Sequence, residues 1–512
     1  MAGFPLTGVD PQDPIPGIIR DLIFAQNASG GGGATRDVVL LGNKTSVGSE
    51  TANTLNTEVI DNSDMEARVG RRSELNWMYR VFRAVDKTAK VYFIAIPEAG
   101  TASTFTLTVA TAATDTSTAV IEWGGETMEM TISSGDAVAT TTDALAAKIN
   151  ANLYWPFTAV SDGVSVVTVT TANTGVRSVY VANPFRVTIR KAIGTTITKS
   201  AVAAGATEDD FTTAYSVLNT AGTFFYQVSA KTAITTVTAT DNGIGEHITN
   251  LASQALPNPG KGQIGIFGLV STQANATLVG VSAPANSVYA VFVRAENNPW
   301  FPGMLASHVA AVKRNAEIVD PGANLTGYTV SDTTTFLVPA PYDKTDYPTD
   351  TEIRADLNNG ITPITFSASG TPSIVRQITA KNWTNSATTK DYRAREGHIP
   401  SVILYIWEVV RSRYAATKQG RVAADPPRGQ KPLPGTTTPG AVKALIQNVI
   451  DDYTFGNANG AGPLLDPTVY QAMQDSVDVR LLTDGISAHV DFVAVRHNNK
   501  GQFQIAETSL AS

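Results

Sequence analysis

The residues that could do chemistry begin with a glycine pattern, Gly260-Lys261-Gly262-Gln263-Ile264-Gly265, which matches G-x-G-x-x-G. In dinucleotide-binding proteins such glycines follow a strand and let a pyrophosphate approach the N-terminus of a helix. Here they precede an apolar segment typical of a strand, and no acidic residue stands where it would bind a ribose. The pattern therefore favours a loop of small residues before a buried strand over a nucleotide site.

The histidines stand in separate segments, at His247, His308, His398, His489 and His497. Only His489 and Asp491 would share a face of one strand, whereas a metal site needs three or more converging ligands. The absence of cysteine excludes disulfides, thiolate ligands and a cysteine nucleophile. No G-x-S-x-G, H-E-x-x-H, Walker A or EF-hand pattern occurs. We therefore predict no catalytic residue, no metal and no cofactor.

Two groups of charged residues have a structural interpretation. We expect one group to be solvated or to cap a helix: Asp343, Asp346, Asp350 and Glu352. The other group brackets a predicted helix after Pro400 and comprises Arg393, Arg395, Arg411, Arg413, Lys418 and Arg421. These basic residues indicate either a solvated helix face or charge matching between subunits.

Composition points to a protein covered largely by other protein. Apolar residues make up 43% of the 512 positions and charged residues only 16%, with a formal net charge of −7. Low charge weakens solubility, and no Lys/Arg cluster tracks phosphates, so nucleic acid is not an expected partner. The N-terminus lacks a basic start and an apolar stretch, and the longest apolar run, 402–407, is too short for a membrane helix. We expect a soluble protein made in the cytoplasm.

The pattern of elements predicts an α/β (α+β) multidomain fold. An apolar strand over 37–42, a helix over 63–85 capped by Ser63 and Glu66, and a strand over 91–96 open an α/β core. Alternating helices and strands return after residue 203, and a helix with Thr438 as N-cap and Pro439 at its first position follows a proline-rich loop. A chain of this length is expected to form two to four domains.

Between these halves the sequence is threonine-rich and alternating, which is typical of a separate β-rich inserted domain. Gly124-Gly125 predicts a hairpin turn, and Leu145, Ile149 and Leu153 predict one helix. We divide the chain into an N-terminal extension (1–36), a first core part (37–97), the insert (98–203), a second core part (204–486) and a C-terminal strand extension (487–512).

Both ends of the chain have the pattern of β-strands on loose tethers. A strand at 17–25 precedes the glycine run 30–33, and residues 489–496 alternate before a turn and a last short strand. Edge strands carry unpaired backbone groups that an extended segment of another molecule can satisfy. We predict strand exchange between subunits through Ile18, Ile19, Leu22, Ile23, Phe24, Val490, Phe492, Val493, Val495, Phe503 and Ile505.

Several segments resemble contractile tail sheath proteins of bacteriophages, particularly the Mu-like group. The segment 352–361 (EIRADLNNGI) is similar to a family segment that starts with an acidic residue and ends in Gly-Ile. The segment 373–379 (SIVRQIT) is similar to the Ile-x-Arg-x-Ile-Thr pattern that follows it in the family. Other segments resemble the family in their place or pattern. They are Asp391-Tyr392-Arg393, the terminal strand 490–495, and residues 135–136, 143–150 and 156–160 of the insert. The proline-dense segment 421–434 departs from the Lys-rich stretch that often follows the family's long helix.

The resemblance implies a structural subunit rather than an enzyme. It implies six-subunit rings stacked around a tail tube in a virion assembled in the host cytoplasm, contracting to drive the tube through the host envelope. Implied partners are neighbouring copies, the tube protein, the baseplate and the tail terminator, without nucleic acid or membrane insertion.

Three other interpretations stay open from the residues. The first is the sheath of a phage-derived bacteriocin or contractile injection system, and the second is another virion component such as a capsid, tube or spike protein. The third is a carbohydrate-active enzyme with a β-rich binding module, although no acid/base pair is identifiable.

Overall fold

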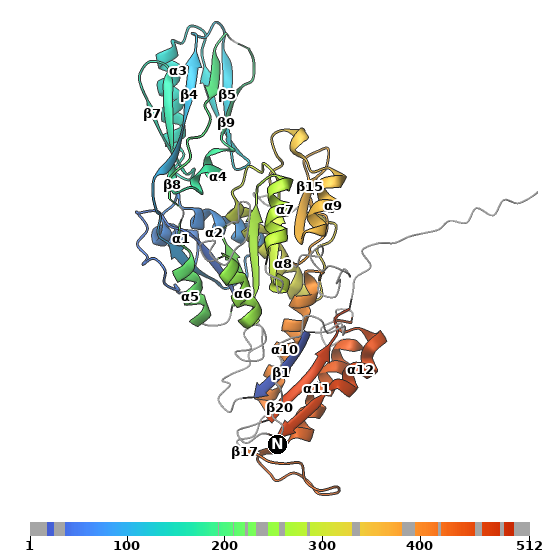
Figure 1. Ribbon diagram of the computed structural model, residues 1–512. Coiled ribbons are helices and arrows are strands. Elements are labelled where there is room, and N and C mark those ends of the chain that lie inside the picture. The colour runs from blue at the N-terminus through green and yellow to red at the C-terminus, as the bar shows by residue number, and fades with distance from the viewer. Residues whose placement is uncertain are drawn as a thin grey trace, which may run out of the picture.

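The computed structural model describes residues 18–24, 36–192, 194–207, 209–220, 224–231, 244–254, 262–283, 287–329, 338–380, 395–417, 421–455, 463–481 and 486–495. The described chain is elongated, with three parts in a row (Figure 1). The β-rich insert lies at one end and a mixed sheet with helices lies in the middle. A helical part with a small sheet, to which both chain ends contribute, lies at the other end.

The middle part is built on an eight-stranded sheet in the order β14-β16-β15-β13-β12-β11-β2-β3. Its strands are β2 (Val38–Asn43), β3 (Val91–Ile96), β11 (Tyr226–Ser229), β12 (Ile264–Leu269), β13 (Ala290–Arg294), β14 (Tyr328–Thr329), β15 (Ile361–Phe366) and β16 (Pro372–Ile374). Neighbours from β3 to β15 are parallel, and the last two pairs at the β14 edge are antiparallel. β2 and β12 are buried throughout because helices cover both faces of the sheet. The predicted α/β multidomain fold class is confirmed.

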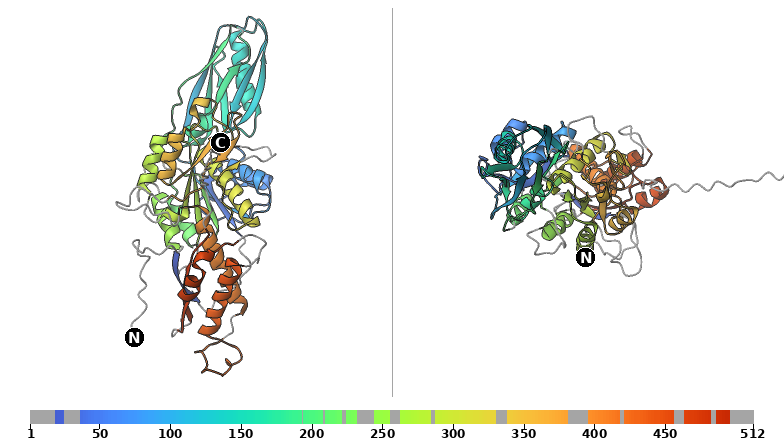
Figure 2. Two further views of the ribbon diagram at one scale, coloured as in Figure 1. Left: turned by 90° about the vertical axis from the view of Figure 1, so that its right-hand side faces the viewer. Right: turned by 90° about the horizontal axis from the view of Figure 1, so that it is seen from above.

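Helices α2 and α8 contact each other on one face of this sheet, and α5, α6, α7 and α9 lie on the other (Figure 2). The helices of the middle part are α1 (Asn62–Val69), α2 (Glu74–Val85), α5 (Thr212–Thr220), α6 (Ile244–Gln254), α7 (Gln273–Ser282), α8 (Pro302–Val319) and α9 (Asp350–Asn358), with the 3-10 turns η1 (Ser287–Tyr289) and η2 (Lys344–Asp346). Glu352 forms a capping box with Thr349 at the start of α9, so this acid does cap a helix.

The single helix predicted over 63–85 is wrong, because the chain forms α1 and α2 with a turn between them. Gly70 ends α1 with a φ of 88°, in the left-handed region that favours glycine. Ser73 then caps α2 by accepting a hydrogen bond from the N–H of Asn76. The N-cap of α1 is Asp61 rather than the predicted Ser63.

The insert folds as two small antiparallel sheets, β10-β4-β8-β7 and β6-β5-β9. Its elements are β4 (Ala102–Ala110), β5 (Ser117–Trp123), β6 (Glu126–Ile132), α3 (Val138–Ala151), β7 (Phe157–Ser161), β8 (Val166–Thr174), α4 (Ser178–Ala182), β9 (Arg186–Ile189) and β10 (Thr196–Lys199). Gly124 and Gly125 both have positive φ and join β5 to β6, which confirms the predicted hairpin turn. Leu153, predicted on the helix, instead lies beyond the end of α3 and is exposed.

The insert is docked firmly on the middle part. Trp77 of α2 meets Trp123 of the insert edge to face, with ring centroids 5.1 Å apart. Trp300 donates from its indole nitrogen to the carbonyl of Gly124 at 2.8 Å. Residues of both parts belong to one buried apolar cluster, so the insert and the middle part share a core.

A buried charge pair adds to this junction. Arg177, at the start of α4, donates to both carboxylate oxygens of Glu74 at 2.5 and 2.6 Å and to Asn43 at 2.8 Å. Asp209 lies 3.8 Å from the same guanidinium. Burial raises the pKa of Glu74 even though the charge of Arg177 opposes the shift.

The third part has its own core. It contains α10 (His398–Thr417), α11 (Pro439–Thr454) and α12 (Tyr470–Ser476), the 3-10 turn η3 (Pro467–Val469), the strands β1 (Ile18–Phe24), β19 (Asp478–Leu481) and β20 (Ile486–Phe492), and the short pair β17 (Arg421–Val422) and β18 (Thr436–Thr437). Thr438 caps α11 and Pro439 begins it, as predicted. Buried residues from Ile399 to Ala494 form a separate cluster. The five-segment division, whose boundaries stay predictions, assigns this cluster partly to the second core part and partly to the C-terminal extension.

We predict that Arg177→Ala lowers the free energy of unfolding by about 3–5 kcal/mol, because it leaves the Glu74 carboxylate buried without its guanidinium. Chemical denaturation measures this loss. The matched control is Arg190→Ala, which removes the partner of Glu129 from an exposed pair and should cost less than about 1 kcal/mol. Equal losses in the two variants would contradict a stabilising role for the buried pair.

Candidate assembly site at the chain termini

The two ends of the described chain meet in a three-stranded sheet, β1-β20-β19. β1 pairs antiparallel with β20 over seven residues, from Ile18 opposite Phe492 to Phe24 opposite Ile486. β19 pairs with the other side of β20. Since β1 is the outer strand, its ladder partner among the described residues is β20 alone.

β20 has the alternation that its sequence predicts. Ile486, Ala488, Val490 and Phe492 are buried, whereas His489 and Asp491 are half-buried. The ring of Phe492 meets Trp407 of α10 edge to face, with centroids 5.0 Å apart. This sheet is therefore fixed to the helices of the third part through β20.

The structure brings most of the predicted exchange residues together. Those in β1 are Ile18, Ile19, Leu22, Ile23 and Phe24, and those in β20 are Val490 and Phe492. Val493 and Val495 follow β20, where the N–H of Val495 donates to the carbonyl of Leu464 at 3.0 Å. Phe503 and Ile505 lie outside the described residues. Within one chain the pairing joins both ends, and exchange between subunits stays a prediction.

The segment that leads from β1 to the central sheet ends at Arg36, which sequence reasoning missed. Arg36 is buried, adopts a φ of 42° and donates to Glu317 of α8 at 2.8 Å. Its guanidinium lies 5.1 Å from the ring of Phe225 and 5.5 Å from that of Tyr405 of α10. Its carbonyl accepts a hydrogen bond from Arg314 at 2.9 Å. Arg36 therefore contacts both the middle part and the third part.

Glu317 is the acceptor on which this cluster depends. Lys313 lies 2.7 Å from its other oxygen, and the Tyr226 hydroxyl donates to it. Burial alone would raise the pKa of Glu317, but the charges of Lys313 and Arg36 outweigh it and the pKa is lowered. The sequence signal was the pair Lys313 and Glu317, four residues apart in an otherwise apolar helix.

Glu408 of α10 lies beside the same cluster. Burial raises its pKa to about 7, although the charges of Arg36 and Arg411 oppose the shift. Another member of the predicted basic group, Arg413, pairs with Asp452 at 2.5 Å within the chain.

The features that suggested chemistry have structural roles instead. A Cβ on Gly262 would lie 1.8 Å from Leu404 of α10, and one on Gly265 would meet Leu251 and Phe267, so these glycines allow close packing. Gly260 and Lys261 lie outside the described residues.

The histidines that the structure describes lie apart from one another. His247, His308 and His398 are buried, and burial lowers the pKa of His247 to about 3. Nε2 of His489 lies 3.6 Å from Asp491, and His497 lies outside the described ranges. Within those ranges, no set of three or more acidic or histidine side chains is placed to hold a metal ion. Likewise, none of the described helices has the length and apolarity to span a membrane.

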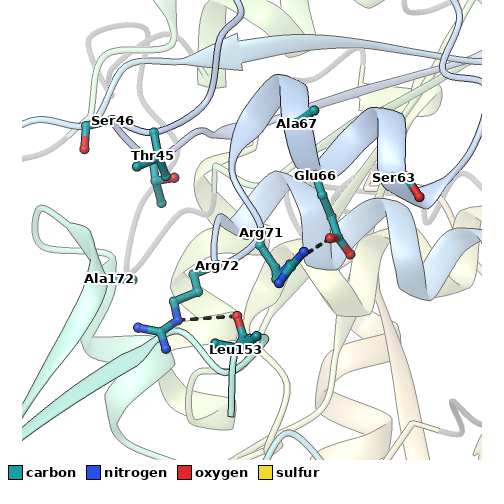
Figure 3. A pocket seen from close by; sticks show the side chains of 10 residues that line it. Thr45, Ser46, Ser63, Glu66, Ala67, Arg71, Arg72, Leu153 and Ala172 are labelled. Atoms are coloured by element: carbon teal, nitrogen blue, oxygen red, sulfur yellow. Dashed lines mark hydrogen bonds and ion pairs between the residues drawn. The ribbon is translucent and has the colours of Figure 1, made fainter. Parts of the chain in front are cut away.

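An open hollow of about 630 Å³ lies where the insert meets the middle part (Figure 3). Arg71 pairs with Glu66 across it at 2.8 Å, and Nε of Arg72 donates to the carbonyl of Leu153 at 3.4 Å. The hydroxyls of Ser46 and Ser63 also line it.

No protein-family model and no curated protein matches the sequence. Among solved structures, the chain is similar to the sheath tail protein Lin1278 from Listeria innocua, with a TM-score of 0.44 and 12% identity over 90% of this chain and 92% of that one. It is also similar to a chain of the anti-feeding prophage baseplate, with a TM-score of 0.44 and 10% identity over 96% and 99%. A third similar structure is the contracted helical sheath of the anti-feeding prophage, with a TM-score of 0.42 and 10% identity over 99% of this chain and 100% of that one.

We predict that Glu408→Gln stabilises the protein at pH 8 but not at pH 5. A folded-state pKa of about 7, above the ordinary glutamate value, means that the protonated carboxyl contributes stability that is lost as the pH rises through 7. The glutamine keeps the neutral form, so the gain at pH 8 should be on the order of 1–3 kcal/mol. Thermal unfolding at the two pH values measures it, with Glu129→Gln as the exposed control. A gain of the same size at both pH values would contradict the assignment.

Proposed function

We propose that the chain is a structural subunit of a contractile tail sheath, of the Mu-like type. It polymerises as stacked hexameric rings around a tail tube and contracts to drive the tube through a host envelope. The observation that carries the proposal is the pairing of β1 with β20, which joins the chain ends at the outer edge of a small sheet. The sheath-like segments in the sequence support it.

Pairing at this edge is transferable between copies. If β1 pairs with β20 of a neighbour in the same register, the same backbone hydrogen bonds form as within one chain. Each contributes a net of about 0.5–1.5 kcal/mol, so exchange costs little and joins two subunits by several kcal/mol. From Phe24 to Arg36 the extended chain spans at most roughly 40 Å, which limits exchange to adjacent subunits.

Contraction then requires no nucleotide. Contacts between subunit bodies change while the strand pairs persist, so the lattice switches between two packings. The energy for the switch is stored during assembly on the tube and released when the baseplate triggers the first ring. In this proposal the α/β core faces the tube and the insert faces solvent, and the other partners are the tube protein, baseplate and tail terminator.

A second candidate context is the sheath of a phage-derived bacteriocin or injection system. Solved structures similar to this chain include sheath proteins of both a Listeria tail and the anti-feeding prophage. The two contexts share the subunit chemistry proposed here, and the genes or particles that accompany the protein distinguish them.

We predict that removal of residues 1–28 abolishes assembly and leaves a folded monomer, because β1 is lost while the apolar clusters remain. Negative-stain microscopy should show hollow cylinders for the full chain and none for the truncated chain. Circular dichroism checks that the truncated chain is folded. Cylinders formed without residues 1–28 would contradict the role of β1.

Disulfide trapping tests exchange directly, since the chain has no cysteine. Asp21 and His489 are Cα partners, a geometry that suits a disulfide. We expect a mixture of Asp21→Cys chains and His489→Cys chains to give a covalent dimer on oxidation. Asp21→Cys mixed with Lys87→Cys, at an exposed position outside both proposed contacts, is the control. A chain that carries both Asp21→Cys and His489→Cys reports pairing within one molecule. If that chain forms an internal disulfide while the mixture gives no dimer, the pairing is intramolecular and the proposal fails.

A further inference from the structure

We propose that residues 421–437, here called the proline loop, form a basic docking element that binds a second copy of this chain at Asp343, Asp346 and Asp350, here called the acidic strip. The inference deepens the proposed function, because it names a contact by which subunits associate in addition to strand exchange.

The proline loop is exposed and positively charged. Arg421, Arg428 and Lys431 project from it, and Lys443 stands beside it on α11. Within the part of the chain that the structure describes, none of these four side chains has a hydrogen-bond or ion-pair partner. On a chain of net charge −7, such an unpaired basic cluster favours contact with an acidic surface.

The loop is also held in one shape. Both carboxylate oxygens of Asp425 accept from the N–H of Gly440, at 2.8 and 3.0 Å, and thereby tie the loop to the first turn of α11. β17 and β18 pair at its base, and Gly429 and Gly435 turn the chain with positive φ. The prolines at 426, 427, 432 and 434 further restrict the backbone. Binding by a preorganised loop loses little conformational entropy.

An apolar side chain lies among these charges. Leu433, between two prolines, is 71% exposed. A partner surface that covered it would gain apolar burial at roughly 25 cal/mol per Å². The loop therefore fits an acidic protein surface with an apolar contact rather than a free anion.

The acidic strip supplies the complementary charge. Asp343 and Asp350 are exposed and Asp346 is half-buried, just before and at the start of α9. Among the described residues, the carboxylates of Asp346 and Asp350 have no hydrogen-bond or ion-pair partner. Tyr347 lies half-buried in the middle of the strip, with its ring packed on that of Phe366.

The positions of the two surfaces exclude contact within one chain. The proline loop is at the far end of the third part, while α9 lies beside the middle part toward the insert (Figure 1). A contact between them must join two copies through different surfaces, and such a head-to-tail contact repeats into rings or filaments. Exposed ion pairs are individually weak, but matched groups of charges set register and speed association.

Charge exchange tests the proposal with the full chain. Variant A carries Arg428→Glu and Lys431→Glu, and variant B carries Asp346→Lys and Asp350→Lys. Each alone places like charges in the contact, so we expect self-association measured by sedimentation at 0.1 M salt to weaken at least tenfold. A mixture of A and B restores opposite charges at every contact and should recover association. The control, Lys87→Glu with Lys90→Glu, makes the same charge change at two exposed lysines elsewhere and should behave as wild type.

Thermal unfolding checks that A and B are folded. If one of them is not, a chain that carries all four changes replaces the mixture, because its loop and its strip have opposite charges and it should associate by itself. If wild type assembles and A does too, or if the mixture is not rescued, the inference is overturned while the proposed function stands. Loss of binding to another acidic protein without loss of self-association would also overturn it. A wild type that stays monomeric would overturn the proposed function first.

Discussion

The buried pair between Arg36 and Glu317 is the interaction on which the junction of the middle part with the third part depends. It fixes the chain where the N-terminal segment enters the central sheet, and the ring of Tyr405 covers the same guanidinium from α10. A lone carboxylate in this position would be costly to bury, but Glu317 is compensated by two cations. An electrostatic contact therefore stands beside apolar packing, such as that of Leu404 of α10, where the third part meets the middle part.

β1 pairs with β20 through a seven-residue backbone ladder. Main-chain hydrogen bonds form equally with any copy of β20 that offers the same register. Because buried and half-buried residues alternate along β20, a shift of one residue in the register would pair each β1 position with a β20 residue of the other kind. In the proposed assembly, the seven-residue ladder that pairs the two ends of one chain would instead join two copies.

The sequence predicted elements well where a local signal decided them and poorly where a tertiary contact did. Thr438-Pro439 and Gly124-Gly125 have direct backbone consequences, and both appeared where expected. Gly70 is an exception: it was missed as a helix end although its positive φ and the Ser73 cap that follows are local signals. Arg36 had no periodic signal at all: its role comes from Glu317, 281 positions away in the sequence.

The distribution of apolar and polar contacts indicates where the subunit can rearrange. The insert and the middle part share one apolar cluster, so separating them would expose Trp77 and Trp123 to water. The third part has its own cluster and meets the middle part through buried polar contacts, such as Lys313 to the carbonyl of Gly397 at 3.2 Å, and through apolar side chains such as Leu404. Separating the buried ions of this junction returns both charges to water and restores their hydration, whereas opening an apolar core exposes its surface to water at a cost. A change of subunit packing is therefore expected to turn the third part against the other two, which move as one body.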